Sequence, residues 1–281
     1  MSFSKDVKVE LSKLANLANK KEVEMEFLGY LLSKNISYEG KYIRFSTEND
    51  YNIDRFAKLI RNIGINQFNI DVNGKIFYIE FNKKDLENFS KFDYKKIDIY
   101  ECINEIKAYI RGLFMGSGSI NDPKKRYHLE CSFNNEKEAQ EVLDLLRKFD
   151  IYFKKGKLKL YLKDGEEISK FLAFIGANKA VIKFEEIRVQ RSMNNKVNRL
   201  VNCESANFNK VLNASIEQVN AIRKLKKNGG FKKLDDNLKE IAELRLKFPN
   251  ISLVELGQKL EQPIGKSGVN YRLKKIVKLA E

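Results

Sequence analysis

The hydrophobic positions in the first third of the chain switch between a helical spacing of three or four residues and a strand spacing of two. A short amphipathic helix is predicted in residues 1–20, where Val7, Leu11 and Leu14 share one face. Residues 21–95 predict the order helix, strand, strand, helix, strand, strand, helix, with elements at 21–33, 36–38, 42–46, 53–63, 66–72, 76–81 and 83–90. In the second hairpin, Asn73-Gly74 is typical of a type I′ turn.

The same order of elements returns in residues 96–187. Its helices are predicted at 100–116, 139–149 and 166–175, and its hairpins at 121–133 and 151–162. Gly29 and Gly112 occupy matching positions in the two leading helices, a repeat distance too long for a solenoid unit. We therefore predict an α+β fold in which an αββαββα unit is duplicated about a pseudo-two-fold axis.

Small residues stand one helical turn apart in both leading helices, Gly29 with Ser33 and Gly112 with Gly116. Such pairs let two helix backbones approach closely, so we expect the two helices to pack on each other at the pseudo-two-fold axis. The alternative is that residues 116–118 form a loop that ends the second helix. The duplication favours the packing interpretation.

Residues 233–281 predict a separate all-α domain of the helix-turn-helix type. A helical apolar stripe ends before Pro249-Asn250, which is a stop signal, and Ser252 and Glu255 then have the spacing of a capping box. Gly257 leaves room for a close helix crossing. After a turn, a final helix is expected from about Ser267, with buried positions at Val269, Leu273, Ile276 and Ala280.

The outward face of that final helix is polar and cationic, which suits docking in the major groove of double-stranded DNA. We expect base contacts from Ser267, Asn270, Tyr271 and Lys274. Phosphate contacts are expected from Lys266, Arg272, Lys275, Lys278 and Ser252. The alternative is a three-helix cap whose lysines are merely solvated.

Residues 188–232 lie between the two predicted domains and begin with a segment rich in Arg and Asn. These side chains suit phosphate and base-edge hydrogen bonds, which predicts a second DNA-contact segment made of Arg188, Arg191, Asn194, Asn195, Asn198 and Arg199. The alternative is a polar loop that pins backbone carbonyls and braces the interdomain junction. A linker helix is expected from Asn209 to about Lys227, followed by a hinge at Gly229-Gly230.

The distribution of charge supports a basic C-terminal part. The chain has 53 Lys and Arg against 38 Asp and Glu, a formal net charge of +15. From Arg188 onward there are 20 basic and 9 acidic residues, whereas the longer remainder is close to balance. Richness in Lys, Asn and Ile is typical of AT-rich genomes, but such drift does not concentrate the surplus in the last third. A basic end is the expected footprint of phosphate contact.

Cysteine and histidine usage argues against several kinds of site. Cys102, Cys131 and Cys203 are far apart and His128 is the single histidine, so neither a zinc site nor a histidine-based catalytic system is expected. Isolated cysteines indicate reduced thiols in a cytoplasmic protein. No apolar run reaches the ~20 residues of a membrane span, and the N-terminus lacks a signal-peptide core. We therefore expect no cofactor, no metal and no membrane partner.

Several segments resemble known families. Residues 27–35, FLGYLLSKN, and 110–118, IRGLFMGSG, look like two degenerate copies of the LAGLIDADG motif of homing endonucleases. RGLFMGSGSINDPKKRYHLE, NRLVNCESAN and PIGKSGVNYRL resemble the WhiA family of bacterial regulators, and the resemblance covers nearly the whole chain. It implies a LAGLIDADG-like domain fused to a helix-turn-helix, nucleoid DNA binding, and roles in cell division and chromosome segregation. In spore formers it further implies transcriptional control of sporulation.

The endonucleases hold divalent metals with an acidic residue at the penultimate letter of each motif. The corresponding residues here are Lys34 and Ser117, one of the wrong charge for a metal site and the other a weak ligand. We therefore expect no enzymatic activity. The alternatives are an active metal-dependent endonuclease and an RNA-binding module. The two pairs of hairpins would form a saddle-like sheet, which we call the saddle. It has two interpretations, a DNA-binding surface or a docking surface for a transcription or division protein.

Overall fold

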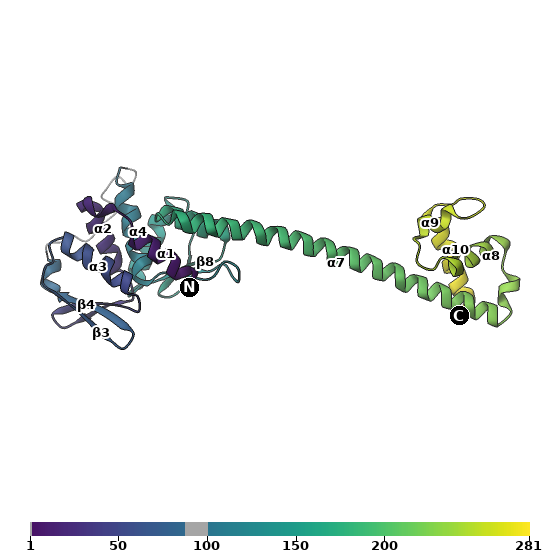
Figure 1. The fold of residues 1–281 in the computed structure, drawn as a ribbon, viewed down its shortest axis with the longest axis horizontal. Coiled ribbons are helices and arrows are strands. Elements are labelled where there is room, and N and C mark those ends of the chain that lie inside the picture. Colours follow the sequence, from purple (N-terminus) through teal and green to yellow (C-terminus); the bar gives the residue numbers. More distant parts are fainter. Residues whose placement is uncertain (1, 88–100) are drawn as a thin grey trace. The chain divides into compact units, whose positions relative to one another are not determined.

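The computed structural model describes residues 2–87 and 101–281, and the chain divides into two compact units, Met1–Ser192 and Met193–Glu281 (Figure 1). The first unit is α+β and contains two antiparallel sheets. The second is all-α. Each unit has its own hydrophobic core.

The first half of the first unit has the predicted order of helices and strands. Its elements are α1 (Phe3–Ser12), a 3₁₀ turn η1 (Asn16–Ala18), α2 (Lys20–Leu31), β1 (Ile36–Glu39), β2 (Tyr42–Thr47), α3 (Asp50–Asn62), β3 (Phe68–Asn73) and β4 (Ile76–Asn82). The strands pair in the order β1-β2-β4-β3. A short 3₁₀ helix, η2 (Lys83–Leu86), stands where a closing helix was predicted, and residues 88–90 of that prediction lie outside the described residues.

The second half repeats this order, which confirms the predicted duplication. Its elements are α4 (Ile103–Ser117), β5 (Ser119–Ile120), β6 (Leu129–Ser132), α5 (Glu136–Arg147), β7 (Lys154–Lys155), β8 (Lys159–Leu162) and α6 (Gly165–Phe174). The second sheet has the order β5-β6-β8-β7, which matches the first sheet strand for strand. Helices α1 to α4 pack beside one another over the strands (Figure 1).

The predicted type I′ turn at Asn73-Gly74 is wrong by one residue. Asn73 still belongs to β3 and pairs with Ile76, so the two loop residues are Gly74 and Lys75. Gly74 has φ +62°, whereas Lys75 is not among the residues of positive φ. A type I′ turn needs positive φ at both loop residues, and a glycine in the first position alone fits type II′ instead.

Helices α2 and α4 cross with their backbones in direct contact, as the small residues predict. A Cβ atom at Gly29 would overlap the carbonyl oxygen of Tyr109, and a Cβ at Gly112 would overlap that of Glu26. One turn further along, a Cβ at Gly116 would lie 2.6 Å from the Ser33 hydroxyl. The contacts at Gly29 and Gly112 are equivalent under the pseudo-two-fold axis. The loop interpretation of residues 116–118 is wrong, since α4 continues to Ser117.

A buried ion network lies beside this crossing. The Glu26 carboxylate on α2 accepts hydrogen bonds from Arg55 Nε and Nη2, each at 2.8 Å, and from Arg111 Nε on α4 at 2.9 Å. Burial opposes ionisation of Glu26, but the hydrogen bonds and charges of Arg55 and Arg111 outweigh it and hold the pKa of this carboxyl below its usual value. The network therefore links α2, α3 and α4 through one negative charge.

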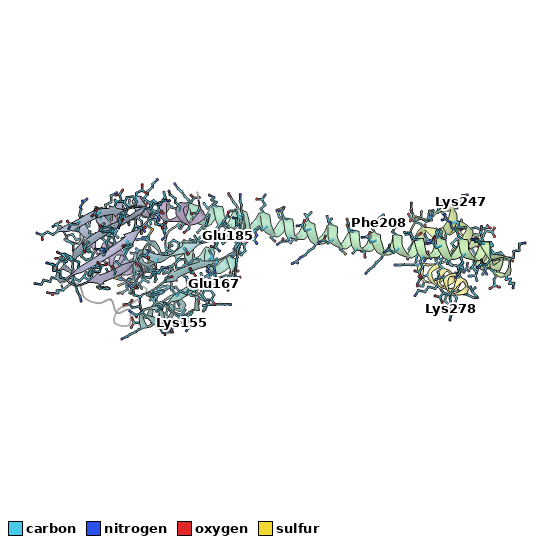
Figure 2. The ribbon with its side chains drawn as sticks, turned by 90° about the horizontal axis from the view of Figure 1, so that it is seen from below. Lys155, Glu167, Glu185, Phe208, Lys247 and Lys278 are labelled. Atoms are coloured by element: carbon cyan, nitrogen blue, oxygen red, sulfur yellow. The ribbon has the colours of Figure 1, made fainter. Side chains whose placement is uncertain are left out.

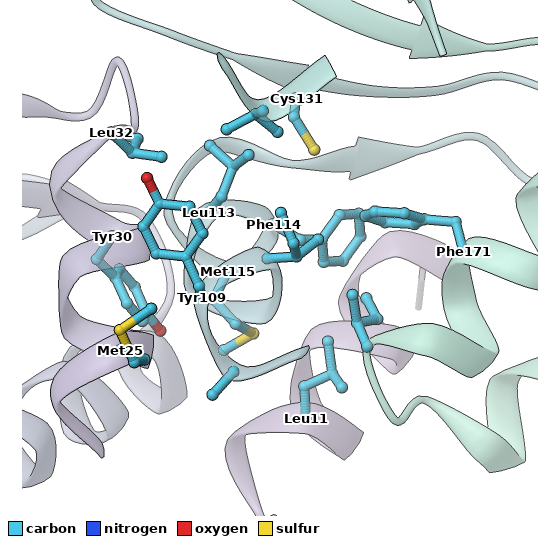
Figure 3. Close-up of a cluster of buried hydrophobic side chains, with 14 of the residues drawn as sticks. Leu11, Met25, Tyr30, Leu32, Tyr109, Leu113, Phe114, Met115, Cys131 and Phe171 are labelled. Carbon is cyan, nitrogen blue, oxygen red and sulfur yellow. The ribbon is translucent and has the colours of Figure 1, made fainter. Parts of the chain in front are cut away.

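Apolar side chains from both halves fill the space around the crossing. Figure 3 shows Tyr30 and Met25 of α2 beside Tyr109 and Leu113 of α4, with Phe114, Leu11, Cys131 and Phe171 completing the cluster. The predicted core face of α1 is confirmed for Val7 and Leu11, which are fully buried, whereas the third predicted residue, Leu14, lies beyond the end of α1 and is half-buried. This continuous core makes the two repeats a single unit.

The second unit contains the end of α7 (Asn178–Lys227), a 3₁₀ helix η4 (Gly230–Lys233), α8 (Asp236–Lys247), α9 (Leu253–Gln258) and α10 (Lys266–Ala280). The linker helix predicted from Asn209 is part of this longer helix, which begins at Asn178, so the Arg- and Asn-rich segment is helical and not a loop. Gly229 has φ +75° and stands where the hinge was predicted, just after α7.

We predict that Gly112→Ala lowers the free energy of unfolding of the first unit by about 3 kcal/mol or more, because the helix backbones must separate to admit a methyl group. Calorimetry of the full chain should show this unit unfolding at a lower temperature. The matched control is Gly268→Ala, at a helical position in α10 where the nearest atoms belong to the Ile264 side chain. Equal stability of Gly112→Ala and wild type would contradict the close crossing.

Candidate nucleic-acid interface

Helices α8, α9 and α10 form the predicted helix-turn-helix. The capping box is present: the Ser252 hydroxyl accepts a hydrogen bond from Glu255 N, and the Glu255 carboxylate accepts one from Ser252 N at 2.8 Å. A Cβ at Gly257 would overlap the carbonyl oxygen of Ile264 and lie 3.0 Å from Val269 of α10. This glycine therefore brings α9 against both the turn and the last helix.

A buried arginine fixes the turn between α8 and α9. Arg245 is 1% exposed, and its Nη1 donates to the carbonyl oxygens of Ile251 at 2.9 Å and Pro249 at 3.3 Å. The Ser215 hydroxyl of α7 donates to the same Pro249 carbonyl. These bonds satisfy backbone carbonyl groups of the turn between α8 and α9. The sequence analysis did not identify Arg245, and the available signal is its position among the buried residues Leu238, Ile241 and Ala242 of α8.

The last helix buries the four residues predicted for it, Val269, Leu273, Ile276 and Ala280. Its opposite face carries side chains at Ser267, Tyr271, Lys274, Lys275 and Lys278, all exposed, with Tyr271 at 70%. Lys266 is also exposed and is the first residue of α10. The positive end of the α10 dipole adds positive potential at this end of the helix.

Other predicted DNA-contact residues of α10 are partly buried or lie close to other protein groups. Asn270 and Arg272 are half-buried on the two flanks of α10. Asn270, Lys274 and Lys278 line a hollow of about 370 Å³ together with residues of α7, namely Ala214, Glu217 and Gln218. Lys275 lies 3.6 Å from the Asp235 carboxylate. Of the predicted base-contact residues, Ser267 and Tyr271 thus lie farthest from competing protein contacts.

The predicted second contact segment divides between the two units. In the first unit, Arg188 pairs with Glu185 at 2.6 Å, and Arg191 donates to the Pro123 carbonyl at 2.6 Å while its guanidinium lies over the Tyr127 ring. Arg191 therefore pins a backbone carbonyl, as the alternative interpretation expected, but it does so from a helix and within the first unit. Four residues belong to the second unit and are exposed along α7: Asn194, Asn195, Asn198 and Arg199.

The two positions that correspond to nuclease metal ligands differ in their surroundings. Lys34 is exposed, and its backbone N–H donates to the Ser132 carbonyl at 3.1 Å. Ser117 is 9% exposed, and its hydroxyl donates to the same carbonyl. Asn35 bridges the two helix ends with a 2.7 Å bond to the Gly116 carbonyl. The ends of α2 and α4 are therefore joined by hydrogen bonds among a lysine, serines and an asparagine.

Within residues 2–87 and 101–281, no group of three or more His, Cys, Asp or Glu side chains is placed to hold a metal ion. Over the same residues, no helix combines the length and apolar content that a membrane crossing requires. Both statements concern only this part of the chain.

The outer face of the first sheet is acidic and internally paired. Arg44 of β2 contacts Glu39 at 3.1 Å and Glu80 at 3.4 Å, and the Tyr78 hydroxyl donates to Asp71 at 3.0 Å. Two carboxylates thus pair with the Arg44 guanidinium, and the third bonds to Tyr78, whose ring lies under that guanidinium. On the second sheet, Lys159 pairs with Glu130 at 3.0 Å, and lysines 154, 155 and 163 lie nearby in sequence. The two sheets of the duplicated fold differ in charge.

Comparison with known proteins gives matches in both units. The family model of the WhiA C-terminal HTH domain matches residues 197–280, and that of the WhiA LAGLIDADG-like domain matches residues 106–194. A relative from Clostridium tetani (strain Massachusetts / E88), named probable cell division protein WhiA, is 34% identical and covers 100% of this chain and 98% of the relative. A relative of the same name from Clostridium beijerinckii is 44% identical over 70% of this chain and 64% of the relative.

Solved structures give the same result for the fold. A crystal structure of full-length DUF199/WhiA from Thermatoga maritima has a TM-score of 0.61 and 26% identity, and covers 100% of this chain and 98% of the other. The N-terminal LAGLIDADG domain of DUF199/WhiA matches with a TM-score of 0.50 and 22% identity, over 62% of this chain and 92% of the other. These matches confirm the fold class predicted from the sequence.

Proposed function

The chain belongs to the WhiA family, and from that premise we propose that it is a DNA-binding regulator of cell division that reads DNA through its second unit. The proposal includes transcriptional regulation, a role in chromosome segregation, and control of sporulation if the source organism forms spores. It also places the protein in the cytoplasm in association with the nucleoid. The relatives are named cell division proteins, which supports the first of these roles.

The observation that carries the proposal is the exposed cationic face of α10 in a capped helix-turn-helix. Lys266, Lys274, Lys275 and Lys278 lie on that face or at its start, beside the exposed Ser267 and Tyr271. In helix-turn-helix proteins the second helix enters the major groove and its N-terminal residues meet base edges. The positively charged last third of the chain provides the accompanying phosphate attraction.

We propose that some residues of α10 contact bases and others contact phosphates. Ser267, Asn270, Tyr271 and Lys274 contact bases, with Ser267 and Tyr271 foremost because they are exposed and early in the helix. Lys266, Arg272, Lys275, Lys278 and the capping Ser252 contact phosphates. Asn194, Asn195, Asn198 and Arg199 remain candidates for a second contact on α7, since their side chains are exposed.

We predict that Tyr271→Ala weakens binding to a selected duplex by about 1–3 kcal/mol and leaves binding to random duplex nearly unchanged, because it removes a base contact. Lys278→Gln should weaken both equally and reduce the slope of log K against log salt by about 1. Fluorescence anisotropy of the full chain with labelled duplexes, across a salt series, measures both effects.

The matched control for charge is Lys232→Gln, at an exposed lysine of η4, which is expected to keep the wild-type slope. Equal losses on selected and random DNA for Tyr271→Ala would show that this residue does not read bases. Tighter binding to structured RNA than to any duplex DNA would favour the RNA-binding alternative.

We propose that the first unit is not a nuclease. Its two helix ends carry Lys34 and Ser117 in place of carboxylates, and Ser117 already donates its hydrogen to the Ser132 carbonyl. Metal-assisted phosphodiester cleavage needs oxygen ligands that bind the ions at the attacking and leaving oxygens. An ammonium group at one of those positions repels the ion instead.

We predict no nicking or linearisation of supercoiled plasmid by the full chain in the presence of Mg²⁺ or Mn²⁺, measured by gel electrophoresis over hours. Plasmid cut by the wild type but not by Ser117→Ala would identify an active endonuclease and refute this assignment. A preparation in which both proteins cut equally would indicate a contaminating nuclease and would call for repurification before the comparison is repeated.

We propose that the saddle of strands docks a protein. Glu39, Asp71 and Glu80 on the outer face of the first sheet outnumber Arg44 and would repel phosphates along half of the saddle. The family's endonuclease relatives lay the corresponding face along DNA. The acidic pairing favours the docking of a basic protein surface over a second DNA contact.

A further inference from the structure

Six large apolar side chains are exposed along the part of α7 that belongs to the second unit. They are Met193, Val197, Leu200, Val201, Phe208 and Val211, with exposed fractions between 45% and 67%. At 100° per residue they fall within an arc of about 100° on the helix surface. We call this set the α7 stripe. Figure 2 labels Phe208, which is 67% exposed.

The α7 stripe continues a face that is buried elsewhere on the same helix. Further along α7, Ser215, Gln218, Ile222 and Leu225 follow at spacings of three and four residues and are buried. Ile222 and Leu225 belong to the core of the second unit, with residues of α8, α9 and α10. From residue 215 onward this face of α7 is covered by the core of the second unit, whereas before residue 215 the same face is exposed.

The other side of this segment is polar. Asn198, Asn202 and Asn209 are exposed and lie on the side of the helix away from the α7 stripe. A helix surrounded by water is expected to be polar on all sides, whereas an apolar stripe opposite a polar one is typical of a helix with a partner. The segment therefore has the surface of a helix that packs against another.

We propose that the α7 stripe pairs with the α7 stripe of a second copy of this chain, in antiparallel orientation. An antiparallel pair centred near Asn202 sets Met193 of each copy near Val211 of the other, and Val197 near Phe208. The stripe is therefore complementary to itself, which a two-fold symmetric interface requires. This proposal goes beyond the proposed function and does not depend on it.

Charge selects the orientation. Glu204 is the charged residue within the arc of the stripe. Parallel helices in register would set Glu204 of one copy against Glu204 of the other, and like charges at a seam repel. In the antiparallel pair, Glu204 instead lies within about one turn of Lys196 of the second copy, which is on the flank of the stripe.

The spacing and the length of the stripe define what kind of dimer is expected. Val197 and Phe208 are eleven residues apart, as are Leu200 and Val211. An eleven-residue repeat has 3.67 residues per turn, so the pair should not form the left-handed supercoil of a heptad coil.

The stripe is about 27 Å long. An interface of that length lies at the low end of specific interfaces, which predicts a dissociation constant on the order of micromolar.

Sedimentation velocity of the full chain from 1 to 100 µM, roughly spanning that constant, tests the pairing. We expect a monomer–dimer equilibrium in the wild type and at least a tenfold weaker dimer in Leu200→Asn with Phe208→Asn. The matched control is Ile216→Asn, which changes an apolar side chain on the same helix that is 50% exposed but points away from the stripe. It should dimerise like the wild type. Circular dichroism checks that each variant keeps its helix content.

A wild type that stays monomeric at every concentration would overturn the proposal. A dimer that survives the double substitution, or one equally weakened by Ile216→Asn, would overturn it as well. If the stripe instead packs within its own chain, the wild type is monomeric and the double variant loses thermal stability.

Spin labels distinguish the two orientations. In a variant with Cys102 and Cys203 replaced by Ser, spin labels are placed at Asn202→Cys or at Asn209→Cys, both on the outer side of the pair. In the antiparallel dimer the Asn202 labels have no axial separation, whereas the Asn209 labels are separated axially by about 21 Å and should therefore give the longer distance. Equal distances at the two positions would indicate a parallel pair and overturn the orientation that we propose.

Discussion

The first unit depends on the contact between the backbones of α2 and α4, which only glycine permits. Gly29 and Gly112 allow each helix to lie against a carbonyl of the other, at equivalent places about the pseudo-two-fold axis. The two sheets take their positions from these helices. The ion pair of Glu26 also depends on the crossing. Because the two helices lie so close together, Arg111 of α4 can donate a hydrogen bond to the Glu26 carboxylate of α2. Larger side chains at Gly29 or Gly112 would push the two helices apart. That would displace the two sheets and break the contact between Glu26 and Arg111.

We propose that this crossing is kept here without the metal chemistry of the nucleases that the two motifs resemble. The helix ends that carry paired carboxylates in the nucleases carry Lys34 and Ser117 here, and hydrogen bonds from Ser117 and Asn35 connect them. The basic surplus lies instead in the last third of the chain. In our account the duplicated unit serves as a scaffold with a protein-docking face, and DNA recognition belongs to the helix-turn-helix.

Most elements of the fold could be predicted from the sequence, because hydrophobic periodicity, hairpin glycines and the Ser252–Glu255 box are local signals. The type I′ turn was wrong because strand register, which places Asn73 in β3, depends on pairing with β4. The break expected before Asn209 was also wrong, although residues 178–227 contain neither Gly nor Pro and so carry no helix stop. Glu26 and Arg245 could not be recognised, since their partners are set by tertiary packing. The exposure of Tyr271 and the half-burial of Asn270 likewise follow from how α10 packs against its neighbours.

In the function that we propose, α10 holds the DNA. Mass spectrometry of lysine acetylation in the full chain, with and without duplex DNA, tests it residue by residue. We expect duplex to protect Lys266, Lys274, Lys275 and Lys278. Lys154 and Lys159 of the second sheet, and Lys163 just after β8, should stay as reactive as in the free protein. Protection of these three lysines, with those of α10 unchanged, would place the DNA on the saddle and refute the role that we propose for α10.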